Sequence, residues 1–171
     1  HGLYLISDEV YREFTYGGEG LRTMAEFTDA AENVVIVDSA SKRFSACGAR
    51  VGALITKNRQ LTQECMKFCQ GRLSVATIDQ VGVTALYGVE SSYFDQTREE
   101  YKRRRDTVVR KLHEIPGVIC EEPKGAFYLM AALPVDDADK FQQWLLTDFS
   151  DHGETVMFAP GESFYATPGK G

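Results

Sequence analysis

A lysine that follows a run of hydroxyl-bearing residues is the first candidate for chemistry in this sequence. Residues 37–52 read VDSASKRFSACGARVG, so Ser39, Ser41 and Lys42 follow directly on an apolar run and Arg50 comes soon after. A lysine whose pKa is lowered by burial or by a neighbouring cation can anchor an aldehyde at neutral pH. Serine hydroxyls and an arginine guanidinium bind phosphate well. The pattern therefore predicts a nucleophilic amine beside an anion-binding site at the end of a strand.

A carboxylate and a phenol form the second candidate group. Asp8 ends an apolar run that begins at Leu3, and Tyr11 follows it closely. A buried carboxylate can hold a heteroaromatic nitrogen protonated by ion pairing, and a tyrosine hydroxyl can hydrogen-bond a phenolate oxygen.

Each candidate, taken alone, also has a structural explanation. Asp8 could form a turn, Tyr11 could belong to the core, Lys42 could be a surface lysine and Arg50 could pair with a carboxylate. It is their combination that favours a site.

The composition describes an ordinary soluble globular protein whose partners are small molecules or other subunits. Its 171 residues are 43% hydrophobic, which is enough for one full domain or two small ones. A net charge of −6 gives no electrostatic reason to bind nucleic acid or an anionic membrane. No apolar run approaches the roughly 20 residues that cross a bilayer, and no secretory signal is recognisable. We therefore predict a cytoplasmic protein.

The cysteines have no spacing that suggests a disulfide framework. Cys65 and Cys69 lie on one predicted helix, but no histidine or second cysteine pair lies nearby to complete a zinc site. We predict free, buried thiols at all of Cys47, Cys65, Cys69 and Cys120, and no metal site.

Strands and helices alternate in the first half of the chain. Strands are predicted at residues 3–10, 33–38 and 51–55, the first of them largely buried, and helices at residues 59–70 and 78–87. Ser74 and Thr77 are candidate caps for the second helix. This alternation predicts an α/β sheet with ligands at its carboxyl edge.

The pattern changes after a long helix that starts at Ser91 or Ser92 and breaks at residues 115–117. Its cluster at residues 98–105 could be a phosphate or nucleic-acid patch, but its mixed acids and arginines favour a solvated, ion-paired face. Three further strands are predicted at residues 118–121, 126–132 and 156–159, with a helix at residues 138–149 between the last two. These elements predict a second, smaller α/β unit.

The ordered combination of these motifs resembles the class I and II aminotransferases, which are fold type I enzymes that use pyridoxal 5′-phosphate. DEVY at residues 8–11, SASK at residues 39–42 and RVG at residues 50–52 carry the resemblance. PKGAFY at residues 123–128 and APGESF at residues 159–164 resemble later parts of the same family. The resemblance implies part of a large cofactor-binding domain at residues 1–92 and part of a smaller α/β C-terminal domain at residues 93–171.

The resemblance also implies a role for each candidate residue. Lys42 would form a Schiff base with pyridoxal phosphate, Asp8 would pair with the ring nitrogen, and Tyr11 would bond the phenolic oxygen. The cofactor phosphate would be held by Ser39 and Arg50, with Ser41 as a further contact.

In the reaction that the resemblance implies, Lys42 moves a proton, and the amino group passes from an amino acid to a 2-oxo acid by ping-pong kinetics. A homodimer is implied as well.

Several parts of the family's active site would have to lie before His1 or after Gly171. These parts are the phosphate-binding turn, the aromatic residue that stacks on the ring, the asparagine near the phenolic oxygen and the arginine for the substrate carboxylate. We therefore expect a carboxyl-side portion of an aminotransferase that, alone, binds the cofactor poorly and does not transaminate.

Three alternatives stay open. The first is another reaction of the same cofactor, such as β-elimination or other lyase chemistry. The second is an aminotransferase-like ligand-sensing domain of a transcription regulator. The third is a doubly wound domain that binds a different phosphate ligand.

Overall fold

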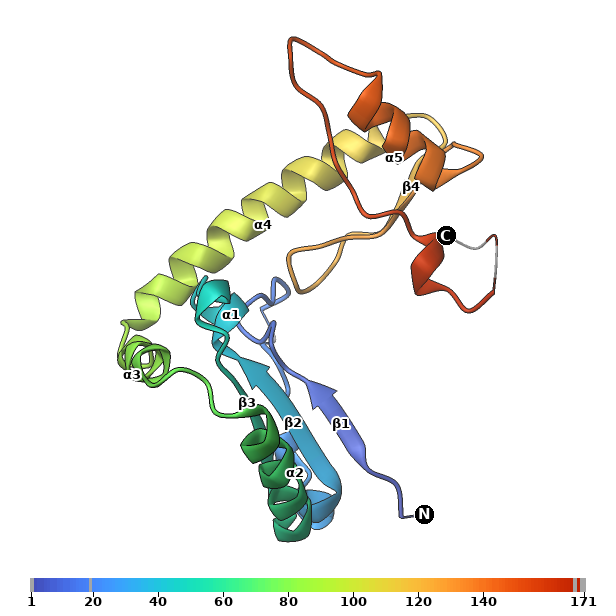
Figure 1. Ribbon diagram of the computed structural model, residues 1–171. Helices are drawn as coiled ribbons and strands as arrows, with labels where there is room; N and C mark the ends of the chain where they lie inside the picture. The colour runs from blue at the N-terminus through green and yellow to red at the C-terminus, as the bar shows by residue number, and fades with distance from the viewer. Residues whose placement is uncertain (1, 19, 168, 170–171) are drawn as a thin grey trace. The chain divides into compact units, whose positions relative to one another are not determined.

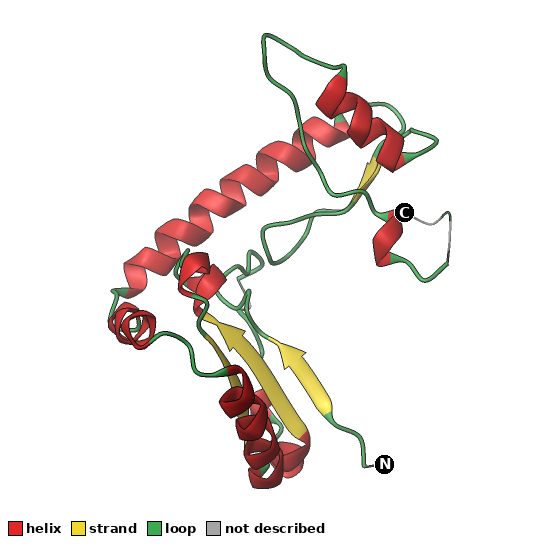
Figure 2. Cartoon of the chain, in the orientation of Figure 1, coloured by secondary structure: helices red, strands yellow, loops and turns green. Residues whose placement is uncertain are grey.

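The computed structural model describes residues 2–18, 20–167 and 169 (Figures 1 and 2). The chain divides into two compact units. The first comprises residues 1–106 and 122–128, and the second comprises residues 107–121 and 129–171. The domains at residues 1–92 and 93–171 stay a prediction.

A three-stranded sheet with the order β1-β2-β3 forms the centre of the first unit. Its strands are β1 (Leu5–Asp8), β2 (Val34–Ser39) and β3 (Gly52–Thr56). β1 pairs with β2 in parallel, with Asp8 opposite Val37, and β3 runs antiparallel to β2, with Gly52 opposite Ser39. The three strands predicted in this half of the chain are confirmed.

Burial is concentrated in the central strand. Val34, Val35 and Ile36 of β2 are each about 5% exposed or less, as expected for β-branched residues of a strand with neighbours on both edges. Ile6 of β1 is 69% exposed, and Leu5 is exposed too. The prediction of a largely buried first strand is wrong because, among the described residues, β1 pairs along one edge only.

The chain turns from strand to helix where the candidate chemistry begins. Ser39 ends β2 and caps the short helix α1 (Ala40–Arg43), because its hydroxyl accepts the Ser41 N–H at 3.1 Å. α1 is followed by a single 3₁₀ turn, η3 (Cys47–Ala49), before the chain enters β3. The N–H of Ala40 also donates to Val51 O at 3.1 Å, which ties the start of α1 to the residue before β3.

Two further helices follow β3, and the second of them joins the core. α2 (Arg59–Arg72) is capped by the side chain of Asn58, and α3 (Thr77–Leu86) packs Val83 against Ala40 and Phe44. Both helices are where the sequence predicted them. The predicted caps of α3 are wrong, because its N-cap is Ala76 and no side chain bonds the first turn. The connection before β2 contains the 3₁₀ helices η1 (Met24–Glu26) and η2 (Thr28–Asn33).

The long helix α4 (Ser91–His113) carries the predicted ion-paired face. Glu100 bonds both Arg103 and Arg104, and Arg98 pairs with Asp95. These i,i+3 and i,i+4 pairs are exposed, which confirms a solvated surface rather than a free basic patch. No helix within the described ranges is long and apolar enough to cross a bilayer.

The described part of the second unit contains the end of α4, the helix α5 and a two-stranded antiparallel ladder. β4 (Ile119–Cys120) pairs with β5 (Ala131–Ala132), and α5 (Ala138–Thr147) follows, capped by Asp137. The 3₁₀ helix η4 (Glu162–Phe164) comes later.

Two strand predictions for the second half of the chain fail, one in part and one entirely. Within residues 126–132 only β5 is a strand, and residues 156–159 form none. At the latter site the N–H of Phe158 donates to the buried side chain of Gln142 at 2.7 Å, so it is satisfied without a strand partner.

All the cysteines are free, but only Cys120 is buried. Burial raises the pKa of the Cys120 thiol, and the nearby Glu121 charge raises it further. Cys65 is half-buried, and Cys47 and Cys69 are exposed. The prediction of buried thiols is therefore confirmed only for Cys120.

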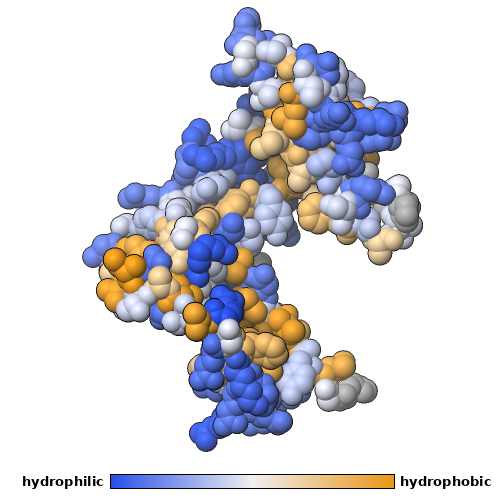
Figure 3. All heavy atoms as spheres, viewed as in Figure 1, coloured by the Kyte–Doolittle hydropathy of each residue, from blue (hydrophilic) through white to orange (hydrophobic). Residues whose placement is uncertain are grey.

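Apolar side chains are exposed on the first unit, as the orange spheres in the lower half of Figure 3 show. Examples are Ile6 on β1, Phe68 on α2 and Ile78 on α3, the last 81% exposed. Such surface is unusual on an isolated soluble domain.

Candidate active site

The two predicted groups of site residues lie at the same edge of the sheet. Asp8 is the last residue of β1 and Ser39 the last of β2, and the two strands are parallel with Asp8 in register with Val37. Carboxyl ends of neighbouring parallel strands carry the ligand sites of α/β sheets. Backbone pairing therefore brings the DEVY and SASK segments side by side (Figure 1).

Lys42 presents a half-buried amine at this edge. It lies in α1, and its Nζ is 5.7 Å from the centroid of the Phe127 ring. Within the described part of the chain, Nζ has no hydrogen bond and no ion pair. The amine is thus uncommitted, as a lysine that anchors an aldehyde must be.

Tyr11 belongs to a cluster of aromatic rings that also reaches Lys42. Its ring packs edge-on against Phe127 at 5.0 Å and Tyr128 at 5.3 Å between centroids. Phe14, which is 2% exposed, contacts both Tyr11 and Phe127. Phe127 is therefore a common neighbour of the phenol and the amine, which brings these two predicted site residues together.

Asp8 has a carboxylate that is exposed and lightly engaged. Its Oδ1 accepts the N–H of Val10 at 3.1 Å in a local turn. This bond fixes the start of the turn that leads to Tyr11 and leaves the other carboxylate oxygen open to a cationic partner.

The predicted phosphate contacts are only partly assembled. The Ser39 hydroxyl lies 3.0 Å from that of Ser41 and 3.2 Å from Val51 O, and can donate to one of them at a time. Arg50 is exposed with φ +55°, and its Nη1 donates to Cys47 O at 3.0 Å. The remaining guanidinium donors of Arg50 are available to an anion.

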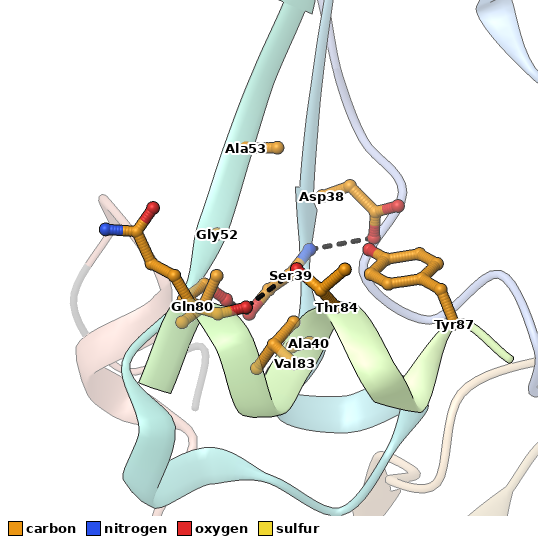
Figure 4. Close-up of a pocket in the computed structure, with 10 residues that line it drawn as sticks. Asp38, Ser39, Ala40, Gly52, Ala53, Gln80, Val83, Thr84 and Tyr87 are labelled. Carbon is orange, nitrogen blue, oxygen red and sulfur yellow. Dashed lines mark hydrogen bonds between the residues drawn. The ribbon is translucent and has the colours of Figure 1, made fainter. Parts of the chain in front are cut away.

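A cavity of about 210 Å³ lies beside Ser39, between β2, β3 and α3 (Figure 4). Gln80, Thr84 and Tyr87 of the α3 region line it, together with Asp38. Lys42, Asp8 and Arg50 are not among its lining residues, so this cavity is not where the motifs predict the cofactor.

Sequence reasoning missed a buried ionic network next to the site. Glu9, Arg12, Glu13, Asp38 and Arg43 are linked by ion pairs, and Glu9 and Asp38 are only 3% and 6% exposed. The one available signal was position, because Glu9, Asp38 and Arg43 are adjacent in sequence to Asp8, Ser39 and Lys42.

Glu9 is the most engaged carboxylate of this network. Its Oε1 accepts the Thr23 hydroxyl and the Met24 N–H, both at 3.0 Å, and its Oε2 accepts Arg12. Burial is the largest influence on the pKa of Glu9 and raises it. The hydrogen bonds from Met24, Thr23 and Arg12, with the Arg12 charge, outweigh burial and leave the pKa below its ordinary 4.5.

Comparison with known proteins identifies the family. The family model for aminotransferase class I and II matches residues 1–169. An aspartate aminotransferase of Bacillus subtilis is 31% identical over 96% of this chain and 42% of its own length. The aspartate aminotransferase of Pyrococcus horikoshii is also 31% identical, over 96% of this chain and 41% of its own length. This chain spans about two fifths of the length of these relatives.

Solved structures resemble the fold as well. An aromatic aminotransferase from Pyrococcus horikoshii aligns with a TM-score of 0.75 and 28% identity, covering 86% of this chain and 40% of that one. YbdL from Escherichia coli, reported with a methionine aminotransferase function, aligns with a TM-score of 0.83 and 26% identity over 99% and 44% of the two chains. The fold and the motifs define part of a fold type I α/β enzyme. The chain belongs to the class I and II aminotransferase family.

Proposed function

We propose that the intact protein is a pyridoxal-phosphate-dependent aminotransferase that moves an amino group between an amino acid and a 2-oxo acid. The observation that carries this proposal is the parallel pairing of β1 with β2, which sets Asp8 beside the segment of Lys42, whose amine is uncommitted. The family to which the chain belongs supports it.

The donor set fits the ring and the aldehyde of pyridoxal phosphate. Lys42 supplies an amine without a protein partner in the described chain, and Asp8 supplies an open carboxylate for the ring nitrogen. Tyr11, which shares the neighbour Phe127 with Lys42, supplies a hydroxyl for the phenolic oxygen.

The phosphate would be held by Ser39 and Arg50, with Ser41 as a further contact. The exposed guanidinium of Arg50 keeps donors free for it, whereas the hydroxyls of Ser39 and Ser41 already bond each other and would have to exchange that bond.

The bound cofactor would supply an electron sink for the charge left when the substrate loses its α-proton. The protein's own contributions are separate. Asp8 keeps the ring nitrogen protonated by charge, and Lys42 accepts and returns the proton at the substrate α-carbon. Tyr11 and the phosphate contacts hold the ring in one orientation.

We further propose that the intact protein is a homodimer in the cytoplasm. The exposed apolar side chains of β1, α2 and α3 support burial against further protein, and the chain spans about two fifths of its relatives' length. Sedimentation as a monomer at working concentration would contradict the dimer.

Covalent trapping tests the proposed chemistry. The intact protein is incubated with pyridoxal phosphate and reduced with borohydride, and the modified peptide is identified by mass. The wild type should carry the modification on Lys42 and should be yellow, through absorption of violet-blue light, before reduction. Lys42→Ala should lose both signals.

Lys67→Ala is the matched control, because Lys67 is an exposed lysine on α2 that pairs with Glu64. It should be trapped as the wild type is. Unchanged cofactor attachment in Lys42→Ala would contradict the proposal. Release of ammonia from the amino acid, with no transfer to a 2-oxo acid, would point instead to lyase chemistry.

A further inference from the structure

Two arginines flank one buried aspartate between the two segments that carry the site. Asp38 is 6% exposed and stands just before Ser39. Its Oδ2 lies 3.7 Å from a guanidinium nitrogen of Arg12 and 3.7 Å from one of Arg43. Its Oδ1 accepts the Ser39 N–H at 2.8 Å. One carboxylate therefore meets both arginines and the backbone of the cofactor-site turn.

The arginines extend this contact into a tie between segments. Arg12 also pairs with Glu9, and Arg43 pairs with Glu13 at 3.0 Å. The Arg12–Asp38 pair joins the segment after β1 to the end of β2, and the Arg43–Glu13 pair joins the same segment to α1. Because there are two such ion pairs, they resist rotation of one segment against the other as well as their separation.

This network is not an efficient way to stabilise a fold. The Nε atoms of both Arg12 and Arg43 are buried and have no hydrogen-bond partner among the residues the structure describes. Buried ion pairs carry a desolvation cost that apolar residues of similar volume avoid, whereas they can fix one geometry. Arginine's rigid planar fork suits that second task.

Arg43 is also held from the helix side. Its guanidinium carbon lies 5.7 Å from the centroid of the Tyr87 ring and 5.9 Å from that of Phe44. Since Arg43 directly follows Lys42 in α1, its position constrains the lysine's backbone.

We propose that Asp38, held between Arg12 and Arg43, is a positioning residue that sets the spacing between the Lys42 amine and the Asp8 carboxylate. The inference rests on the proposed function, because that spacing matters only if one ligand must meet both groups. Displacements of about 1 Å can change rates about a hundredfold.

The test uses the intact protein with pyridoxal phosphate and two variants. Asp38→Asn preserves an oxygen for the Ser39 N–H but removes the charge, and Arg43→Ala removes the tie to Glu13. Two quantities are measured: the rate constant of borohydride-trapped attachment to Lys42, and the visible circular dichroism before reduction, divided by the moles of cofactor that reduction then traps. We expect attachment at least about tenfold slower and an altered dichroism in both variants.

Further variants keep the test decisive. Arg110→Ala removes an exposed pair with Glu114 and should behave as the wild type in both measurements. If Arg43→Ala does not fold, Glu13→Gln replaces it in the test, because it breaks the same Arg43–Glu13 ion pair. The double variant Glu13→Gln/Arg43→Ala should attach the cofactor no more slowly than Arg43→Ala. Arg43→Ala already removes the Arg43–Glu13 ion pair, so Glu13→Gln has no further contact of this pair to break.

The outcomes separate the two proposals. A wild-type protein that gives no adduct at Lys42 contradicts the proposed function. A wild-type adduct, with folded Asp38→Asn and Arg43→Ala matching the wild type in rate and dichroism, overturns the positioning role. Variants that lose thermal stability but keep both signals per folded molecule overturn it as well.

Discussion

Replacing Glu9 with glutamine should destabilise the protein strongly although the two side chains have the same shape. The Glu9 side chain is 2% exposed. Both carboxylate oxygens face donors. One accepts hydrogen bonds from the Thr23 hydroxyl and the Met24 N–H, and the other accepts one from the Arg12 guanidinium. Wherever the amide NH₂ of a glutamine points, it meets one of these donors.

The magnitude follows from the two orientations of the glutamine amide. An NH₂ toward Arg12 sets donor against donor and removes the nearer of the two carboxylates that face this guanidinium, which leaves Asp38 at 3.7 Å. Because the Arg12 side chain is 26% exposed and keeps that second partner, the cost is about 3 kcal/mol, the lower end of the range for breaking a buried pair. An NH₂ toward the Met24 N–H leaves that buried donor without an acceptor, which costs about 1–3 kcal/mol. This orientation also removes the negative charge of Glu9 that faces Arg12. We therefore expect Glu9→Gln to lower the free energy of unfolding by about 3 kcal/mol.

Urea unfolding at neutral pH measures this loss. Glu26→Gln is the matched control, because Glu26 pairs with Arg22 on the surface, where the two side chains are 47% and 86% exposed. That exposed pair should contribute no more than about 0.5 kcal/mol. A Glu9→Gln protein within about 0.5 kcal/mol of the wild type would refute the reasoning.

The pH dependence supplies a second check with a definite sign. The pKa of Glu9 in the folded protein lies below its ordinary 4.5, because hydrogen bonds and the Arg12 charge outweigh burial. The stabilisation from ionised Glu9 is thus fully present above pH 4.5 and is lost as the pH falls through the lowered folded pKa. The difference between wild type and Glu9→Gln should shrink over that acidic range and stay constant above it.

Further substitutions test the site and its support. Asp8→Ala should keep trapped cofactor but lower the rate of amino transfer at least about a hundredfold, and a wild-type rate would exclude the proposed role. Phe14→Ala should cost about 3–5 kcal/mol in urea unfolding, whereas Phe68→Ala, at an exposed position, should stay within about 0.5 kcal/mol. Ser39→Ala should cost about 1 kcal/mol through loss of the α1 cap, and Ser74→Ala, which removes no cap, serves as its control.

The parts of the fold that the sequence predicted well are those that local pattern controls. The β-branched run of β2 and the helices α2 and α3 lie where the residue pattern within each segment predicts them. The long helix α4 is marked by its ion pairs at helical spacing. Because parallel pairing sets strand ends in register, these local predictions already bring Asp8 near the turn of Lys42.

The errors occur where distant residues decide the outcome. The exposure of Ile6 depends on which strands flank β1 rather than on its own apolar pattern. Phe158 lies outside any strand because its N–H is taken by the side chain of Gln142. The network around Asp38 joins two segments well separated along the chain, so no local spacing reveals it.

The two segments of the candidate site meet through two different kinds of contact. Tyr11 and Lys42 share the ring of Phe127, and edge-on rings tolerate small sliding movements. The Arg12–Asp38 and Arg43–Asp38 contacts are ion pairs at 3.7 Å, so the same sliding would move opposite charges apart. The rings therefore provide apolar contact, while the charges restrict the relative position of the strand ends. Loss of the Phe14 ring should then appear as lost stability, whereas loss of the Asp38 charge should also slow cofactor attachment.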